Sequence, residues 1–297
     1  MSTSDPQRKA SRTALNVAML RAVHQTLDGQ PKILDDPIAA VMLGDEFDQQ
    51  ITAYADRARE PWIMELGSQV VLRSRFAEDR LADAVRRGVR QCVILGAGFD
   101  TFAYRQPDWA RGLRIFEVDH QGTQEEKRRR LARAGISQPA NLQYVAIDFE
   151  STTLRQGLQR SSLDFSTPTF FSCLGVLVYL TRDAVDAIFE LVAGFPQASE
   201  IAFTFSTPDR AVSDLADRVS LLGEPWQTHF NREEIVQHLA ALGFQETSML
   251  NTDEAERTLF QRRGDGLHAP RRGGIAIAVV GPHLDRQENS GPANQTG

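Results

Sequence analysis

Short apolar runs alternate with helical patterns over the last two thirds of this chain. Seven runs rich in β-branched and aromatic residues predict strands, and they cover Cys92–Leu95, Arg114–Val118, Gln143–Ile147, Thr169–Cys173, Ile201–Phe205, Glu246–Leu250 and Gly274–Val280. This alternation predicts an α/β fold, in which a mostly parallel sheet is covered by helices on both faces. Ligands of such sheets bind beyond the carboxyl ends of the strands.

The first third of the chain is predicted to be helical, and capping residues mark where several helices begin and end. The predicted starts are Asp36 followed by Pro37, Thr181, and Asn231 in a capping box with Glu234, and Gly44 and Gly243 are predicted ends. A longer helix is predicted from about Met64 to Arg87, ending at Gly88. We therefore expect a single domain over residues 11–285. It would consist of a helical cap (11–88) and an α/β core (89–285) with an insertion at about 206–230, between disordered tails at 1–10 and 286–297.

Composition narrows the possible partners. The net charge of −6 argues against nucleic acid, because phosphate binding needs a basic face. The one basic cluster, Lys127 to Arg130, follows two glutamates on a predicted helix and is expected to be a solvated face. Cys92 and Cys173 lie in apolar runs, which favours buried thiols in a reducing compartment. With no apolar stretch near 18 residues and no signal-like start, we expect a cytoplasmic protein without a membrane partner.

The most informative segment follows the first predicted strand. That strand leads into Gly96-Ala97-Gly98, with Asp100 and Thr101 directly after. Glycines at such a turn allow a ligand to approach the backbone. A dinucleotide fingerprint would have a third glycine where this chain has Thr101. The pattern therefore favours a ligand with a nucleoside but without a diphosphate.

Acidic residues end the next two predicted strands. Asp119 lies 21 residues after Gly98, where an acid accepts hydrogen bonds from both ribose hydroxyls. A helix N-cap or surface acid is the alternative reading, and Glu117 is a competing ribose ligand on the same side of the strand. Asp148 and Phe149 end the third strand and are candidates for contacts with adenine, although a structural turn is also possible there.

Arg73 is the candidate ligand for a carboxylate. At 100° per residue it falls within the apolar stripe of its predicted helix, whereas Arg75 points away. A guanidinium on an inward face needs an anion to offset its desolvation. That anion could be the carboxylate of a methionine moiety, or a core partner such as Asp119 or Asp100.

Candidates for chemistry on the acceptor are weak. Gly175 allows close approach of the backbone after the fourth strand, and Tyr179 either lines the pocket or packs in the core. His229, in the insertion, is the one histidine considered as a general base. The histidines show no metal-ligand spacing, so no metal site is expected.

Taken together, several motifs resemble the S-adenosylmethionine-dependent methyltransferases of the leucine carboxyl methyltransferase type, in particular their bacterial branch. They are Ser11-Arg12-Thr13-Ala14, Asp35-Asp36-Pro37, Arg73-Ser74-Arg75-Phe76, Leu95 to Thr101, Phe116 to His120, Asp148-Phe149, Gly223 to Trp226 and Gly264 to Leu267. The resemblance implies a Rossmann-like class I methyltransferase fold: seven strands with the last antiparallel, and N-terminal helices capping the site.

The resemblance also implies the cofactor, S-adenosyl-L-methionine, and its ligands. Arg73 would hold the methionine carboxylate, Gly96 and Gly98 would approach the cofactor, and Asp119 would take the ribose. Asp148 and Phe149 would hold the adenine. Many relatives have a glutamate where this chain has Leu174, which leaves one cofactor contact unaccounted for and disfavours a protein substrate.

The expected reaction is in-line methyl transfer to an oxygen of a small molecule or peptide. A carboxylate acceptor is ionised at neutral pH and needs no base, which the shortage of base candidates favours; a hydroxyl acceptor would need one, such as His229. Two alternatives stay open: a nicotinamide-dependent oxidoreductase and a non-catalytic cofactor-binding protein. The sequence does not indicate an oligomeric state.

Overall fold

The computed structural model describes residues 11–147, 152–208, 226–271 and 273–282. The two predicted tails and most of the predicted insertion lie outside these ranges. Asp148 and Phe149, the predicted adenine ligands, also lie outside them.

Seven strands form one sheet in the order β3-β2-β1-β4-β5-β7-β6. Neighbouring strands from β3 to β5 are parallel, while β7 runs antiparallel to both β5 and β6. The prediction of a mostly parallel sheet with an antiparallel last strand is confirmed. The strands are β1 (Gln91–Leu95), β2 (Arg114–Asp119), β3 (Leu142–Ala146), β4 (Thr169–Cys173), β5 (Glu200–Phe205), β6 (Phe244–Met249) and β7 (Gly274–Val280).

Helices cover both faces of this sheet. One face packs against apolar residues of α6 (Leu154–Gln159), α7 (Arg182–Ala193) and α9 (Arg232–Leu242). The other face packs against α4 (Pro61–Arg86), and α5 (Gln121–Arg133) lies on the same side. A short helix, α10 (Thr252–Ala255), follows β6.

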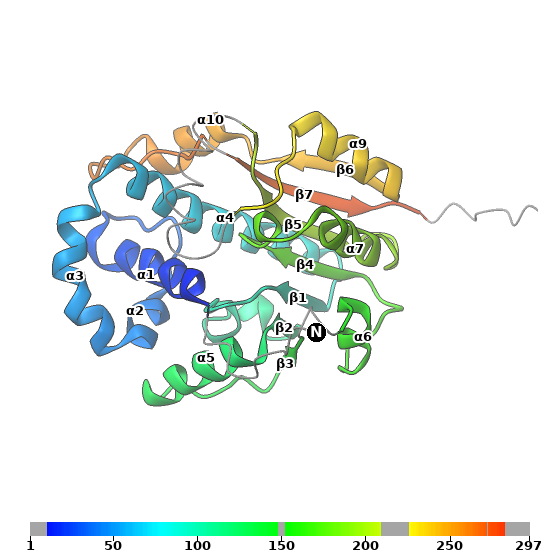
Figure 1. Cartoon of the computed structure of the whole chain (residues 1–297), viewed down its shortest axis with the longest axis horizontal. Coiled ribbons are helices and arrows are strands. Elements are labelled where there is room, and N and C mark those ends of the chain that lie inside the picture. Colours follow the sequence, from blue (N-terminus) through cyan, green and yellow to red (C-terminus); the bar gives the residue numbers. More distant parts are fainter. Residues whose placement is uncertain (1–10, 148–151, 209–225, 272, 283–297) are drawn as a thin grey trace, which may run out of the picture.

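Three further helices of the described residues form a separate group near the carboxyl ends of the parallel strands. They are α1 (Arg12–Leu27), α2 (Pro37–Leu43) and α3 (Asp45–Arg57), and they gather beside the sheet on the left of Figure 1. Their shared apolar cluster includes Phe99, which follows the glycine turn after β1. The N-terminal helices therefore lie where an α/β sheet binds its ligand.

Capping residues fix several helix ends as the sequence predicted. Thr181 accepts a hydrogen bond from the backbone N–H of Ala184 at the start of α7. Asn231 and Glu234 form the capping box of α9, and Gly243 ends that helix in the left-handed conformation. These helix ends could be predicted from the sequence because each capping contact joins residues only three or four positions apart.

One part of the basic cluster is not a solvated face. Lys127 is fully buried, and its Nζ lies 2.5 Å from a carboxylate oxygen of Glu117, which is also fully buried. Burial raises the pKa of Glu117 to about 7, although the Lys127 ammonium opposes that rise. The prediction was wrong for Lys127, and Glu117 is occupied in joining α5 to β2 rather than free to bind a ribose.

Candidate functional site

The backbone turns sharply after β1 at two glycines. Gly96 has a φ of +62° and Gly98 a φ of +50°, a region that favours glycine. A Cβ on Gly96 would lie 2.4 Å from Cγ2 of Val176, and a Cβ on Gly98 would lie 3.1 Å from Cβ of Ala14. A side chain at position 96 is therefore excluded, and one at position 98 would press on Ala14.

Asp119 at the end of β2 faces the same turn. Its carboxylate accepts hydrogen bonds from the backbone N–H groups of Gly98 and His120, both at 2.7 Å. Burial raises the pKa of Asp119, with the two hydrogen bonds opposing the rise. The N-cap of α5 is His120, so the helix-cap alternative for Asp119 is wrong. The carboxylate is instead fixed against the glycine turn.

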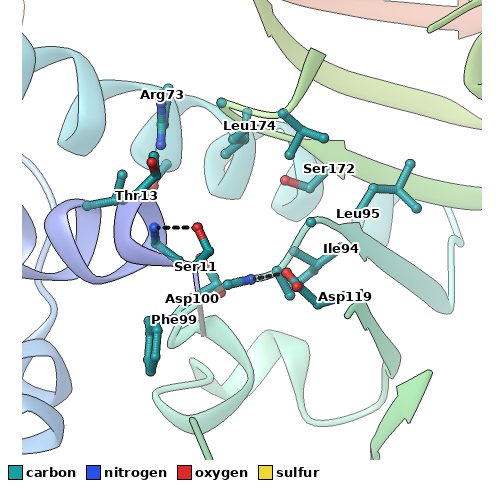
Figure 2. A pocket seen from close by; sticks show the side chains of 18 of the residues that line it. Ser11, Thr13, Arg73, Ile94, Leu95, Phe99, Asp100, Asp119, Ser172 and Leu174 are labelled. Carbon is teal, nitrogen blue, oxygen red and sulfur yellow. Dashed lines mark hydrogen bonds between the residues drawn. The ribbon is translucent and has the colours of Figure 1, made fainter. Parts of the chain in front are cut away.

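These groups line a cavity of about 210 Å³ at the carboxyl ends of the central strands. Six of the predicted site residues line it: Arg73, Gly96, Gly98, Asp119, Leu174 and Tyr179. Figure 2 shows Arg73 and Asp119 at opposite ends of the cavity, with Leu174 between the two ends. The start of α1, with Ser11, Thr13 and Ala14, contributes the wall nearest the N-terminus.

Arg73 projects into this cavity without a carboxylate partner. In the described part of the chain its guanidinium forms no ion pair, and Asp100 pairs with Arg21 instead, at 3.2 Å. Burial lowers the pKa of Arg73 to about 10, so it remains charged at neutral pH. Gly175 lies beside this guanidinium, where a Cβ would be 2.6 Å from Nη1 of Arg73, and its φ of +71° favours glycine. The core ion pair considered for Arg73 is not formed.

A buried ionic network ties the cap to the glycine turn, and the sequence did not indicate it. Arg21 of α1 lies 2.7 Å from the carboxylate of Asp36 and donates to Thr101 Oγ1 at 2.9 Å. Thr101 donates to Asp36 at 2.7 Å. Burial alone would raise the pKa of Asp100, but Arg21 and other nearby cations outweigh it and lower that pKa. Thr101 occupies the third glycine position because its hydroxyl joins this network.

The network also corrects the role of Asp36. Asp36 precedes α2 as predicted, but its side chain makes no capping hydrogen bond. Its carboxylate is fully buried between Arg21 and Arg105, whose Nε lies 3.5 Å away. An N-cap and an acid that holds two buried guanidinium groups have the same local sequence, and only the tertiary contacts distinguish them.

A second cavity, of about 90 Å³, adjoins the first. The two share the wall residues Thr13, Val17, Arg73, Gly175 and Tyr179. The rest of the second wall is mainly apolar, with a few neutral polar groups; its residues include Leu20, Leu66, Val70, Val178, Phe205 and Trp226, together with Asn16, Gln69, Thr204 and Ser206. Two ligands could therefore meet at Arg73 and Tyr179.

His229 lines neither cavity. Its Nδ1 lies 2.9 Å from the hydroxyl oxygen of Ser206, which does line the second cavity. Tyr179 lines both. Of the two weak candidates for acceptor chemistry, Tyr179 faces the cavities directly, whereas His229 could act only through Ser206.

Comparison with solved structures identifies the fold class of this protein. A crystal structure of a methyltransferase from Thermobifida fusca matches with a TM-score of 0.56 at 19% identity, over 94% of this chain and 100% of that chain. A DUF574 family protein from Streptomyces avermitilis matches with a TM-score of 0.53 at 14% identity, over 90% and 97%. At these identities the likeness concerns the fold alone. This fold is the Rossmann-like class I methyltransferase fold.

Sequence comparison gives the family. The model of the leucine carboxyl methyltransferase family matches residues 14–193. YktD of Bacillus subtilis, named as an S-adenosyl-L-methionine-dependent methyltransferase, is 30% identical over 89% of this chain and 95% of that protein. A protein of Mycobacterium avium with the same kind of name is 32% identical over 78% and 82%. The chain belongs to the leucine carboxyl methyltransferase family, and it is an S-adenosylmethionine-dependent methyltransferase.

The family excludes the nicotinamide-dependent oxidoreductase that the sequence left open, so that alternative is wrong.

Two further findings concern membrane-spanning helices and metal sites among the described residues. None of their helices is long and apolar enough to cross a membrane. Nor do three or more of their His, Cys, Asp or Glu side chains come together as a group that could hold a metal ion.

Proposed function

We propose that this protein transfers the methyl group of S-adenosylmethionine to an oxygen of a small molecule or peptide. The observation that carries the proposal is the partly buried Arg73 guanidinium, which has no anionic partner in the described part of the chain and lines both cavities. A charge that is largely removed from water in this way needs an anion to offset its desolvation. The methionine carboxylate of the cofactor is such an anion.

The residues of the first cavity fit the cofactor along its length. Arg73 would bind the carboxylate at one end, and Asp119, already fixed by the Gly98 N–H at 2.7 Å, would accept from the ribose hydroxyls at the other. Gly96 and Gly98 would let the cofactor approach the backbone. Leu174 would add an apolar contact between the two ends. Asp148 and Phe149 are proposed to hold the adenine; they lie outside the described residues.

Few further groups are required for the reaction. When bound, the cofactor supplies a methyl group activated by its positively charged sulfur. The protein's part is to align the acceptor with that group and to exclude water. The second cavity would hold the acceptor, since it shares Arg73 and Tyr179 with the first.

Thermal unfolding tests cofactor binding. A ligand at a hundredfold its Kd stabilises a protein by about 2.7 kcal/mol. We expect S-adenosylhomocysteine to raise the melting temperature by several degrees and NAD or NADP to leave it unchanged. Stabilisation by NAD and not by S-adenosylhomocysteine would refute the assignment of the first cavity.

A labelled-methyl assay identifies the atom that accepts the methyl group. The same assay distinguishes an enzyme from a non-catalytic cofactor-binding protein. The protein is incubated with S-adenosylmethionine labelled in the methyl group and with panels of carboxylic acids, phenols and peptides. Methyl esters release labelled methanol in alkali, whereas methyl ethers do not. We expect label on oxygen, so label found on nitrogen or carbon would contradict O-methyl transfer.

A further inference from the structure

The second cavity has a wall that suits an uncharged ligand. Among the described residues that line it, Arg73 is the only one with a full charge at neutral pH. Arg73 also lines the first cavity, where the proposed function commits it to the cofactor carboxylate. A carboxylate acceptor would then lack a protein counter-charge, and burying an unpaired carboxylate is costly. A neutral acceptor avoids this cost.

The same wall offers polar groups for an oxygen. The indole Nε1 of Trp226 is buried and has no hydrogen-bond partner in the described part of the chain. Ser206 also lines the cavity, and the residue is 3% exposed. Its hydroxyl lies 2.9 Å from Nδ1 of His229. Leaving a buried N–H unpaired costs free energy, so a ligand oxygen is the expected partner of the indole.

We propose that the acceptor is a small, mainly apolar compound with a neutral phenol-type hydroxyl, and that Ser206 relays the proton of this hydroxyl to His229. The proposal rests on the proposed function, because it presumes methyl transfer to oxygen. Apolar walls suit an aromatic ring, and a phenol ionises near pH 10, far more readily than an aliphatic alcohol. The Ser206–His229 pair supplies the base that a hydroxyl acceptor requires.

Neighbouring contacts hold this pair in place. Ser206 directly follows β5, and its carbonyl accepts a hydrogen bond from the N–H of Phe230 at 2.8 Å. Arg182 donates to the carbonyl of His229 at 3.0 Å and pairs with Glu234 at 2.8 Å. Among the described residues, Arg182, which is itself paired with Glu234, is thus the charged group that contacts His229. Arg182 and Glu234 belong to elements on the same face of the sheet, α7 and α9.

The step balances without a further reactant. The acceptor O–H bond breaks and its proton passes to Ser206 Oγ, while the Ser206 hydroxyl proton passes to Nδ1 of His229. The acceptor oxygen bonds to the methyl carbon, and the electron pair of the breaking carbon–sulfur bond stays on sulfur. The products are a methyl ether, S-adenosylhomocysteine and a protonated His229, which is half-buried and can release its proton to water. This relay requires the His229 tautomer with Nδ1 unprotonated.

Shape-matched acceptors test the ligand class. The full chain is assayed with labelled S-adenosylmethionine and two series of probes, 4-alkylphenols and 4-alkylbenzoates of the same sizes. We expect alkali-stable label on the phenols and none on the benzoates. Label on the benzoates alone, or on neither series while S-adenosylhomocysteine still binds, would overturn the proposed acceptor. Failure to bind S-adenosylhomocysteine would instead overturn the proposed function itself.

Variants test the relay. Ser206→Ala and His229→Asn should lower the rate with a phenol by about 10²- to 10⁴-fold at pH 7, the range for a lost general base. The loss should shrink toward pH 10, where the phenol ionises unaided. Ser206→Thr keeps the hydroxyl and should retain most of the rate. Ser68→Ala, at a buried serine of α4 outside both cavities, is the matched control and should change nothing. A loss equal at all pH values would show that Ser206 only positions the acceptor.

Discussion

At the scale of single residues, the carboxylate of Asp119 is held in position to bind a ligand. It is held by two backbone N–H groups at 2.7 Å, which leaves lone pairs free to accept from hydroxyl groups in the cavity. Asp119→Ala should weaken the binding of S-adenosylhomocysteine by about 1–3 kcal/mol, because buried partners lose their acceptor. Isothermal titration calorimetry measures this change, and an unchanged Kd would remove Asp119 from the site.

The pH dependence of binding follows from the same residue. Burial raises the pKa of Asp119, and only the carboxylate form can accept from both ribose hydroxyls. Affinity for S-adenosylhomocysteine should therefore fall as the pH drops, starting above the ordinary aspartate value of about 3.9. The contribution of Asp119 to the free energy of unfolding depends on pH in the opposite direction. This contribution is largest at low pH and is lost as the pH rises through the raised pKa of Asp119. Asp119→Asn should flatten the pH profile of binding.

Arg73 gives a second prediction at this scale. Arg73→Met removes a partly buried guanidinium that has no carboxylate partner in the described residues, so the free energy of unfolding without cofactor should not fall. The affinity for S-adenosylhomocysteine should fall by about 1.5–3 kcal/mol, the usual value of a hydrogen bond to a charged group. Arg75→Met is the matched control, since Arg75 pairs with Asp79 on the outer side of α4. An unfolded Arg73→Met variant would mean that the arginine is structural.

Among the elements, the N-terminal helices depend on one buried network for their attachment to the glycine turn. Asp36 is fully buried between two guanidinium groups. Asp36→Asn removes the negative charge and should destabilise the protein by about 3–5 kcal/mol, as expected when a buried ion pair loses one partner. Urea denaturation measures this loss. The exposed neighbour Asp35 provides the control, and Asp35→Asn should change stability by at most about 0.5 kcal/mol.

The ion pair that attaches α5 to β2 can be tested by comparing a single variant with a double variant. Lys127→Met leaves Glu117 buried without its partner and should cost about 3–5 kcal/mol. Replacing both residues with apolar ones should recover most of that loss, since no buried charge then remains. Arg129→Met, at an exposed ion pair of the same helix, should have little effect. A double variant no more stable than Lys127→Met would contradict this account.

The bounds of the elements were largely predictable, and the exceptions have physical reasons. β4 and β7 span the predicted residues, because both are continuous apolar or β-prone runs. β6 begins at Phe244, two residues before the predicted start, and its register with β7 shifts between Phe244 and Glu246. An irregularity of this kind depends on the partner strand, which local sequence does not reveal.

For the whole molecule, the site forms where segments distant in sequence meet. Ala14 at the start of α1 lies against the turn at Gly98, and Ser11, Thr13 and Ala14 line the same cavity as Arg73. Helical periodicity predicted that Arg73 points inward, and strand ends predicted Asp119. The order of the strands, the Arg21 network and the Ser206–His229 pair could not be predicted, because they depend on contacts between residues 15 to 80 positions apart.

A crystal structure of the full chain with S-adenosylhomocysteine tests the central claim most directly. We predict the ligand in the first cavity, with its carboxylate within hydrogen-bonding distance of Arg73, its ribose hydroxyls at Asp119, and its sulfur toward the second cavity. A ligand bound in the reverse direction, in another cavity, or away from Arg73 and Asp119 would contradict the account.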